Sequence, residues 1–182
     1  MAEGIEKRLW SMENVVALIE CAVGERQRRN ARRLILMAGS PLSIELHIFL
    51  SDASAPTGRD WQHAIEAAGF PLILHAESDL ALYRGFVPAT YKGRQTGFEF
   101  YLDAASDILA AYPHVGQQAG RRTRCATLRW SGDLLEMCAA LAAAVSLAKL
   151  TDGLYFSPED GTVSEPDEAL AAARNELKSA DL

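Results

Sequence analysis

Cysteine is scarce in this chain of 182 residues, and the few present follow no recognised pattern. The three cysteines, Cys21, Cys125 and Cys138, are an odd number and show neither CxxC spacing nor the spacing of a metal site. A disulfide framework and a zinc centre are therefore not expected. We expect a protein of the reducing cytoplasm that a hydrophobic core alone holds together.

Segments for export or for crossing a membrane are also missing. Residues 1–7 are charged and lack the apolar run and small-residue cleavage site of a secretion signal. The most apolar stretch, Met137 to Ala148, is shorter than the roughly 20 residues that cross a bilayer, so we expect a core helix there and no membrane partner. The length suits one domain over residues 1–182, with a flexible start over residues 1–10.

Signatures of covalent catalysis and of cofactor binding are absent too. No serine lies in a Gly-x-Ser-x-Gly elbow, and no cysteine has the surroundings of a known nucleophile. The segment Lys92 to Gly97 lacks the Gly-Lys-Ser/Thr end of a phosphate loop, and it leads into a strand where that motif needs a helix. We therefore assign no catalytic residue, no metal ligand and no cofactor from motifs.

Charge is distributed unevenly along the chain, whose net charge is −6. Five arginines and one glutamate between Glu25 and Arg33 give that segment +4, which leaves −10 on the rest. An acidic body disfavours general binding to nucleic acid, although clustered arginines grip phosphates well. The alternative for residues 26–33 is a solvated helix face that pairs with the acidic body or with a neighbouring subunit, which leaves a homodimer open.

Hydrophobic periodicity predicts an α+β domain. Alternating residues predict five strands, at Ile44–Leu50, Phe70–His75, Gly97–Leu102, Arg124–Trp130 and Leu154–Phe156. Helical spacing and capping residues predict helices at Ser11–Met37, Thr57–Gly69, Asp103–Tyr112, Asp133–Asp152 and Pro166–Lys178. The first of these segments is either one long helix or two short ones broken near Gly24. This order favours a mainly antiparallel, ferredoxin-like sheet of about five strands, with helices packed on one face and extra helices at both termini.

The alternation also predicts a polar face on the side of the sheet away from the helices. It gathers there Glu45, His47, Phe49, Glu99, Tyr101, Thr127 and Arg129. A carboxylate beside an imidazole, with a second carboxylate, a phenol and a guanidinium on neighbouring strands, has the parts of an acid–base site. The alternative is an open face that is solvated or binds a partner. A metal held by His47 and His75 with Glu45 or Glu99 is a further hypothesis that strand spacing specifies poorly.

The connection from Ala76 to Thr96 is predicted to be a long loop, broken by glycine and proline. It contains Tyr83, Arg84, Phe86 and Tyr91, which belong to the residue types that dominate interface energies. Either these side chains bind a partner or the aromatic rings fold back and close one end of the core. As partner-binding candidates we therefore name nine residues: Tyr83, Arg84, Phe86, Tyr91, Glu45, His47, Glu99, Tyr101 and Arg129.

Four stretches of the sequence resemble a known group of proteins. They are Gly97–Phe100, Thr127–Asp133, the alanine-rich helix that follows, and Tyr155–Gly161. Over residues 42–173 the chain resembles small uncharacterised bacterial cytoplasmic proteins, a group that includes immunity proteins of contact-delivered or secreted toxins. The stretches that carry this resemblance are strands, a cap and a turn, so no functional residue is transferred from them.

The resemblance implies a non-catalytic protein that binds and neutralises one cognate toxin or effector. An acidic inhibitor suits a basic toxin surface, because complementary charges speed encounter and favour the right partner. The alternative is a small enzyme or ligand-binding protein that uses the polar sheet face, with Glu45, His47, Glu99 and Tyr101.

Overall fold

A computed structural model of the chain describes residues 44–51, 56–75, 80 and 83–180. All of them belong to one compact unit that spans Leu42–Leu182. The expected helix at Ser11–Met37, the arginine-rich residues 26–33 and the expected flexible start lie outside the described residues. The account below therefore concerns the α+β unit alone.

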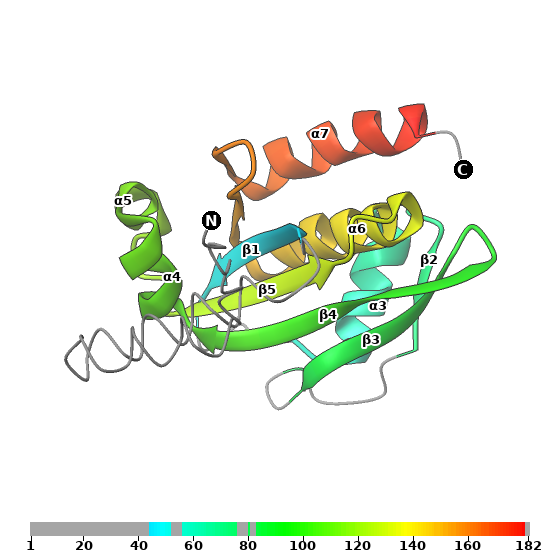
Figure 1. Cartoon of the computed structure of the whole chain (residues 1–182), viewed down its shortest axis with the longest axis horizontal. Helices are drawn as coiled ribbons and strands as arrows, with labels where there is room; N and C mark the ends of the chain where they lie inside the picture. Colours follow the sequence, from blue (N-terminus) through cyan, green and yellow to red (C-terminus); the bar gives the residue numbers. More distant parts are fainter. Residues whose placement is uncertain (1–43, 52–55, 76–79, 81–82, 181–182) are drawn as a thin grey trace, which may run out of the picture. The chain divides into compact units, whose positions relative to one another are not determined.

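The unit is built on an antiparallel sheet with seven strands in its described part (Figure 1). These strands are β1 (Ile44–Leu50), β2 (Leu72–Leu74), β3 (Arg84–Tyr91), β4 (Arg94–Ala104), β5 (Arg124–Trp130), β6 (Leu154–Ser157) and β7 (Thr162–Ser164). Their order across the sheet is β2-β3-β4-β5-β1-β6-β7, and every neighbouring pair is antiparallel. The predicted α+β class and the predicted antiparallel sheet are confirmed. The predicted number of about five strands is wrong, because the sheet has seven in the described part. The ferredoxin-like arrangement is not confirmed.

The sequence prediction missed β3. This strand lies in the segment that was predicted to be a loop, and it carries part of the site described below. Gly85, at φ +119°, and Pro88 interrupt its pattern, because glycine and proline normally mark the ends of strands. The carbonyl of Pro88 accepts from the backbone N–H of His75 at 2.9 Å, on the β2 side. Since N–H and C=O of one residue point the same way in an antiparallel strand, the missing N–H of Pro88 removes nothing from the β3–β4 ladder.

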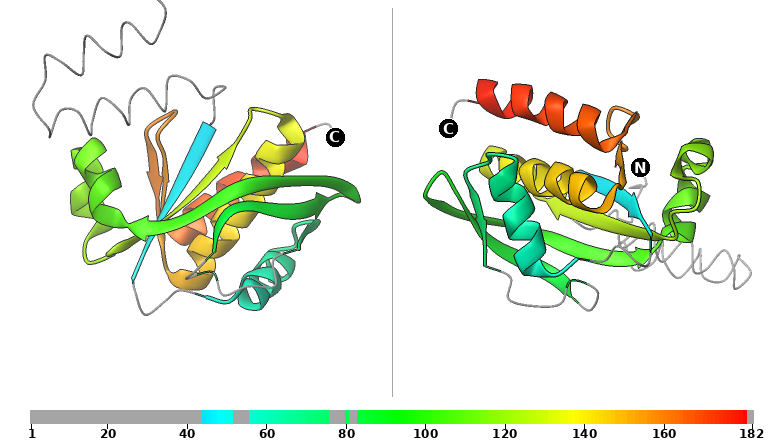
Figure 2. Two further views of the ribbon diagram at one scale, coloured as in Figure 1. Left: turned by 60° about the horizontal axis from the view of Figure 1, so that its bottom comes forward. Right: turned by 180° about the vertical axis from the view of Figure 1, so that it is seen from behind.

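In the described part of the chain, three helices share the larger core with one face of the sheet (Figure 2). Helix α6 (Leu134–Thr151) crosses β1 and its neighbours, with α3 (Gly58–Ala67) beside it toward β2 and α7 (Pro166–Ser179) beside it toward β6. The alanines of α6 let α3 approach closely, and the indole N–H of Trp61 donates to the Ala143 carbonyl at 2.8 Å. Two predicted caps are confirmed, because Thr57 forms a capping box with Asp60 and Asp133 accepts from two N–H groups of α6. The predicted cap at Asp103 is wrong, because Asp103 belongs to β4 and α4 begins after Ala104 without a side-chain cap.

Helix α6 is long and apolar enough to cross a membrane by length and composition, yet 72% of its apolar window is buried inside the protein. That burial fits the core helix expected for Met137 to Ala148. Its Leu141 and the facing Leu128 of β5 belong to one core, which also contains inward side chains of β3 and β4.

A second apolar cluster lies on the opposite face of the sheet, so the prediction that helices pack on one face only is wrong. The segment of α4 (Ala105–Ala111), the 3-10 turn η2 (Pro113–Val115) and α5 (Gly116–Ala119) packs there. Val115 and Ala119 bury Phe49, Cys125 and Phe156 of the neighbouring strands. Alternation in a strand shows which residues share a face, but it does not show whether another segment covers that face.

Candidate functional site on the outer face of the sheet

The face of the sheet opposite α6, here called the outer face, holds two cross-strand rows of side chains. The first row pairs Phe86 with Glu99, Glu99 with Arg129, and Arg129 with Glu45. The second row pairs Arg84 with Tyr101, Tyr101 with Thr127, and Thr127 with His47. The predicted grouping of residues from β1, β4 and β5 on one face is therefore confirmed, and β3 adds Phe86 and Arg84.

Glu45 joins a guanidinium and an imidazole at the β1 end of these rows. Arg129 donates from Nε to Glu45 Oε2 at 2.8 Å, and His47 Nε2 lies 3.3 Å from Glu45 Oε1. The contact with His47 and the charge of Arg129 lower the pKa of Glu45 to about 2, although burial of the carboxylate acts in the opposite direction. His47 Nε2 has no hydrogen-bond partner, so its contact with Glu45 is a close approach without a hydrogen bond.

His47 itself is fully buried, with an exposed fraction of 0%. Its Nδ1 lies 3.0 Å from Thr127 Oγ1, and its ring stacks on Phe156 with centroids 5.8 Å apart. Tyr112, from the end of α4, lies 6.4 Å from the His47 ring and packs edge-on against Phe156, with centroids 5.0 Å apart. The expectation of an open face is therefore wrong at His47 and at Phe49, where the α4–α5 segment covers the sheet.

Cys125 is the residue at this site that sequence reasoning missed. Its Sγ lies 3.8 Å from His47 Nδ1, so a thiol, an imidazole and the Glu45 carboxylate stand in a line, as in nucleophilic active sites. The thiol is only 1% exposed, and burial raises its pKa to about 12. In this arrangement Cys125 is a protonated core side chain. The sequence did contain a signal for this residue. Cys125 lies two residues before Thr127, so alternation along β5 puts both side chains on the same face.

The half of the outer face over β3 and β4 is open to solvent. Tyr101 donates to Glu99 Oε2 at 3.0 Å, and the guanidinium of Arg129 lies 5.6 Å from the centre of the Tyr101 ring. Arg84 forms a bidentate ion pair with Asp103, in which one contact measures 3.1 Å. The polar side chains here are already paired, which holds their positions.

Phe86 projects from this open half with 55% of its surface exposed. Its ring lies directly over Gly97, since a Cβ added there would be 2.3 Å from Phe86 Cζ. The neighbouring Tyr83, which is half-buried, donates its hydroxyl to the Phe86 carbonyl. An exposed aromatic ring is thus fixed on a rigid strand instead of a loop.

Two predicted groupings are wrong. Tyr91 is a core residue, 1% exposed, because alternation along β3 turns Val87, Ala89 and Tyr91 toward α6. His75 cannot join His47 at a metal, because β3, β4 and β5 separate their strands, and its Nε2 contacts Thr90 Oγ1 at 2.8 Å instead. In the described part of the chain, no group of three metal-ligating side chains converges.

No family model, curated protein or solved structure matches this chain. The fold and the outer face define a class only: an α+β protein with an antiparallel sheet, one buried polar cluster and one open aromatic and charged strip. The functional argument therefore depends on that strip and its chemistry.

Proposed function

We propose that this chain is a non-catalytic binding protein of the immunity type, which neutralises a cognate toxin or effector in the bacterial cytoplasm. The binding surface in this proposal is the open half of the outer face, with Phe86, Glu99, Tyr101 and Arg129 as its centre and Arg84 at its edge. The net charge of −6 supports a basic partner.

The observation that carries the proposal is the exposed ring of Phe86, which is fixed over Gly97. A rigid aromatic side chain loses little conformational entropy when a partner covers it, and such residues dominate interface energies. Tyr101 holds Glu99 through its hydroxyl and Arg129 through its ring, so these three side chains supply a polar rim that needs no rearrangement.

The test starts from the genes that flank the one for this chain, since an immunity gene is expected to lie beside its toxin gene. Each neighbouring product is expressed in a host cell with and without this chain, and growth is measured. We expect one product to be toxic and this chain to restore growth. Phe86→Ala with Tyr101→Ala should weaken binding by about 2 kcal/mol or more and leave Tm nearly unchanged.

Glu66→Gln with Glu168→Gln serves as the matched control, because both glutamates are exposed and lie on helices of the opposite face. This control should restore growth like the original chain. Growth rescue that survives the Phe86 and Tyr101 changes would contradict the proposed surface. Neighbouring products that are neither toxic nor bound would contradict the immunity function.

The line of Cys125, His47 and Glu45 favours a second candidate, a small enzyme or ligand-binding protein that uses Glu45, His47, Glu99 and Tyr101. This function requires the α4–α5 segment to move, because it covers His47. Cys125→Ser separates the two candidates. Under the binding proposal the variant neutralises the toxin normally, whereas a nucleophilic role for the thiol predicts complete loss of activity.

A further inference from the structure

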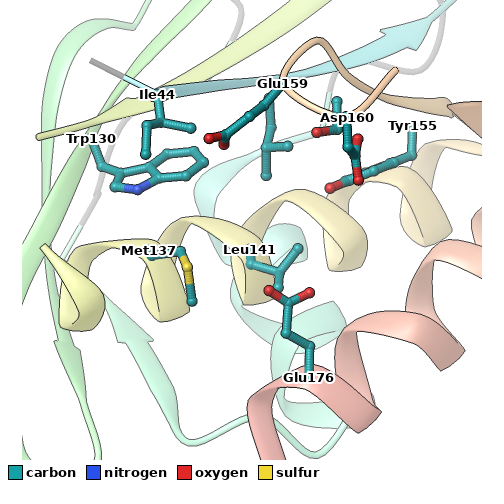
Figure 3. Close-up of a pocket in the computed structure, with 10 residues that line it drawn as sticks. Ile44, Trp130, Met137, Leu141, Tyr155, Glu159, Asp160 and Glu176 are labelled. Atoms are coloured by element: carbon teal, nitrogen blue, oxygen red, sulfur yellow. The ribbon is translucent and has the colours of Figure 1, made fainter. Parts of the chain in front are cut away.

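Two cavities with borders of opposite charge lie on the helix side of the sheet. The first, between Trp130 and Tyr155, is bordered by three carboxylates, one of which is Glu176 of α7 (Figure 3). The second has a volume of about 540 Å³ and lies where the turn after α3, the β3–β4 hairpin and the end of α7 meet. Every described charged residue that borders the second cavity is a cation, so this cavity attracts anions although the whole chain is acidic.

The cations that border the second cavity are Lys92, Arg174 and Lys178. None of them forms an ion pair with a described residue. Arg174 is held in place, because its Nε and one of its Nη atoms donate to the Ala68 carbonyl at 3.3 and 3.0 Å. This contact occupies one edge of the guanidinium and leaves the other amino group free to donate to an anion.

Tyr91 gives an independent indication that the second cavity accepts a ligand. The residue borders the cavity and is only 1% exposed, and its hydroxyl forms no hydrogen bond with a described residue. The hydroxyl is not one of the fully buried polar atoms that lack a partner, so the small exposed part of Tyr91 includes this oxygen. Burial raises the pKa of Tyr91, so the hydroxyl keeps its proton and can donate to a ligand in the cavity.

The rest of the described lining is mainly apolar and includes Phe70, Pro71 and Leu177. Phe70 and Leu177 are core residues whose side chains are largely buried. The volume of the cavity lies within the range of sites that bind small molecules. A ligand that fits this cavity therefore combines an anionic group with an apolar body.

We propose that the second cavity binds a small phosphate monoester whose organic part is apolar. The phosphate group lies among the three cations, because its double charge and three free oxygens match several donors better than a carboxylate does. The Tyr91 hydroxyl donates to one of these oxygens. The organic part covers Phe70 and Leu177.

The charge of the ligand distinguishes a monoester from the phosphodiester of a nucleic acid. A monoester carries nearly two negative charges above neutral pH, whereas a diester carries one. Because three cations border the cavity, the second charge strengthens binding. This site lies on the other side of the sheet from Phe86, so its test is independent of the proposed function.

The test measures binding of phenyl phosphate to the full chain by NMR titration at pH 8. Inorganic phosphate has the charge without the apolar body, and methyl phenyl phosphate has the ring with one charge only. We expect phenyl phosphate to bind at least about tenfold more tightly than either compound. Equal binding of phenyl phosphate and inorganic phosphate would overturn the proposal, and so would tighter binding of the diester.

Variants then connect binding to the cavity. Lys92→Gln with Lys178→Gln should weaken binding of phenyl phosphate by about tenfold or more, because both charges border the phosphate. The matched control, Arg59→Gln with Arg121→Gln, removes the same charge from exposed positions outside the cavity and should change the Kd by less than about twofold. Equal weakening in both pairs would show general charge attraction and overturn the site.

Tyr91→Phe removes only the hydroxyl and keeps the buried ring. This variant should bind phenyl phosphate about fivefold or more weakly, with Tm nearly unchanged, because a donor to a charged oxygen is lost. Tyr155→Phe removes the same atom from the border of the first cavity and should change the Kd by less than about twofold. Binding by Tyr91→Phe that equals binding by the original chain would overturn the proposed site.

Discussion

At the scale of single residues, Glu45 is the side chain whose ionisation is tied most closely to the fold. It pairs with Arg129 across two strands and approaches a histidine that is fully buried. These contacts exist only when β1 and β5 are aligned, so they are lost in the unfolded chain. The ionised carboxylate therefore contributes to the stability of the native state.

The pKa of Glu45 makes this contribution depend on pH. Its value in the folded protein is about 2, against an ordinary value of 4.5. Because the folded value is the lower one, the stabilisation is complete above about pH 4.5 and is lost as the pH falls toward 2. Glu45→Gln should therefore reduce the free energy of unfolding at pH 7 by up to about 3 kcal/mol.

Urea unfolding at pH 7 and at pH 3 measures this effect. The difference between the original chain and Glu45→Gln should shrink at the lower pH, because at pH 3 Glu45 is largely protonated in the unfolded chain while the folded carboxylate keeps most of its charge. Glu168→Gln, an exposed position on α7, is the control and should show little difference at either pH. If Glu45→Gln reduces the free energy of unfolding by the same amount at pH 7 and at pH 3, the loss is due to packing and not to ionisation.

At the scale of elements, the pairing of β3 with β4 positions the proposed binding strip. Gly97 stands opposite Pro88, and a Cβ there would lie 2.6 Å from the Val87 carbonyl as well as against the Phe86 ring. Only glycine lets the two strands approach this closely while the ring of Phe86 lies over them. The exposed aromatic ring thus depends on the absence of a side chain on the next strand.

Gly97→Ala should reduce the free energy of unfolding by about 1 to 3 kcal/mol, because the added methyl group meets backbone as well as ring. Removing the ring in Phe86→Ala with Gly97→Ala should restore only part of this loss, since the Val87 carbonyl still blocks the methyl group. Gly116→Ala is the control, as a Cβ there meets nothing within 4 Å. Thermal unfolding measures the stability of these three variants. A Gly97→Ala variant as stable as the original chain would contradict the close pairing of β3 with β4.

At the scale of the whole α+β unit, the sheet separates two apolar clusters of different size. The larger contains α6 with Cys138, and the smaller contains Cys125 beneath the α4–α5 segment. Both thiols are buried, and burial raises the pKa of each. The two cysteines therefore report separately on the opening of the two faces.

In a Cys21→Ser background, a thiol reagent at pH 8 should label neither Cys125 nor Cys138 while the protein is folded. Adding Val115→Asp puts a charge into the smaller cluster, so Cys125 should be labelled well below the unfolding temperature while Cys138 stays protected. Mass spectrometry of tryptic peptides distinguishes the two sites. Labelling of both cysteines at the same rate would show that the two clusters open together.

Local patterns were sufficient to predict the larger elements. Alternation in β1, β4 and β5 placed Glu45, Glu99 and Arg129 on one face, because neighbouring side chains of a strand point to opposite sides. Thr57 and Asp133 marked helix starts, because their oxygens accept the free N–H groups of a first turn. These features depend on residues close in sequence, so a short stretch of the chain is enough to specify each of them.

Long-range contacts decided the rest. The strand β3 exists despite Gly85 and Pro88 because β4 and β2 pair with it on both sides, and that pairing turns Tyr91 inward and Phe86 outward. The covering of His47 follows from a segment more than 50 residues further along the chain. Periodicity assigns each side chain to a face, but only tertiary packing determines which faces are covered and which stay open to a partner.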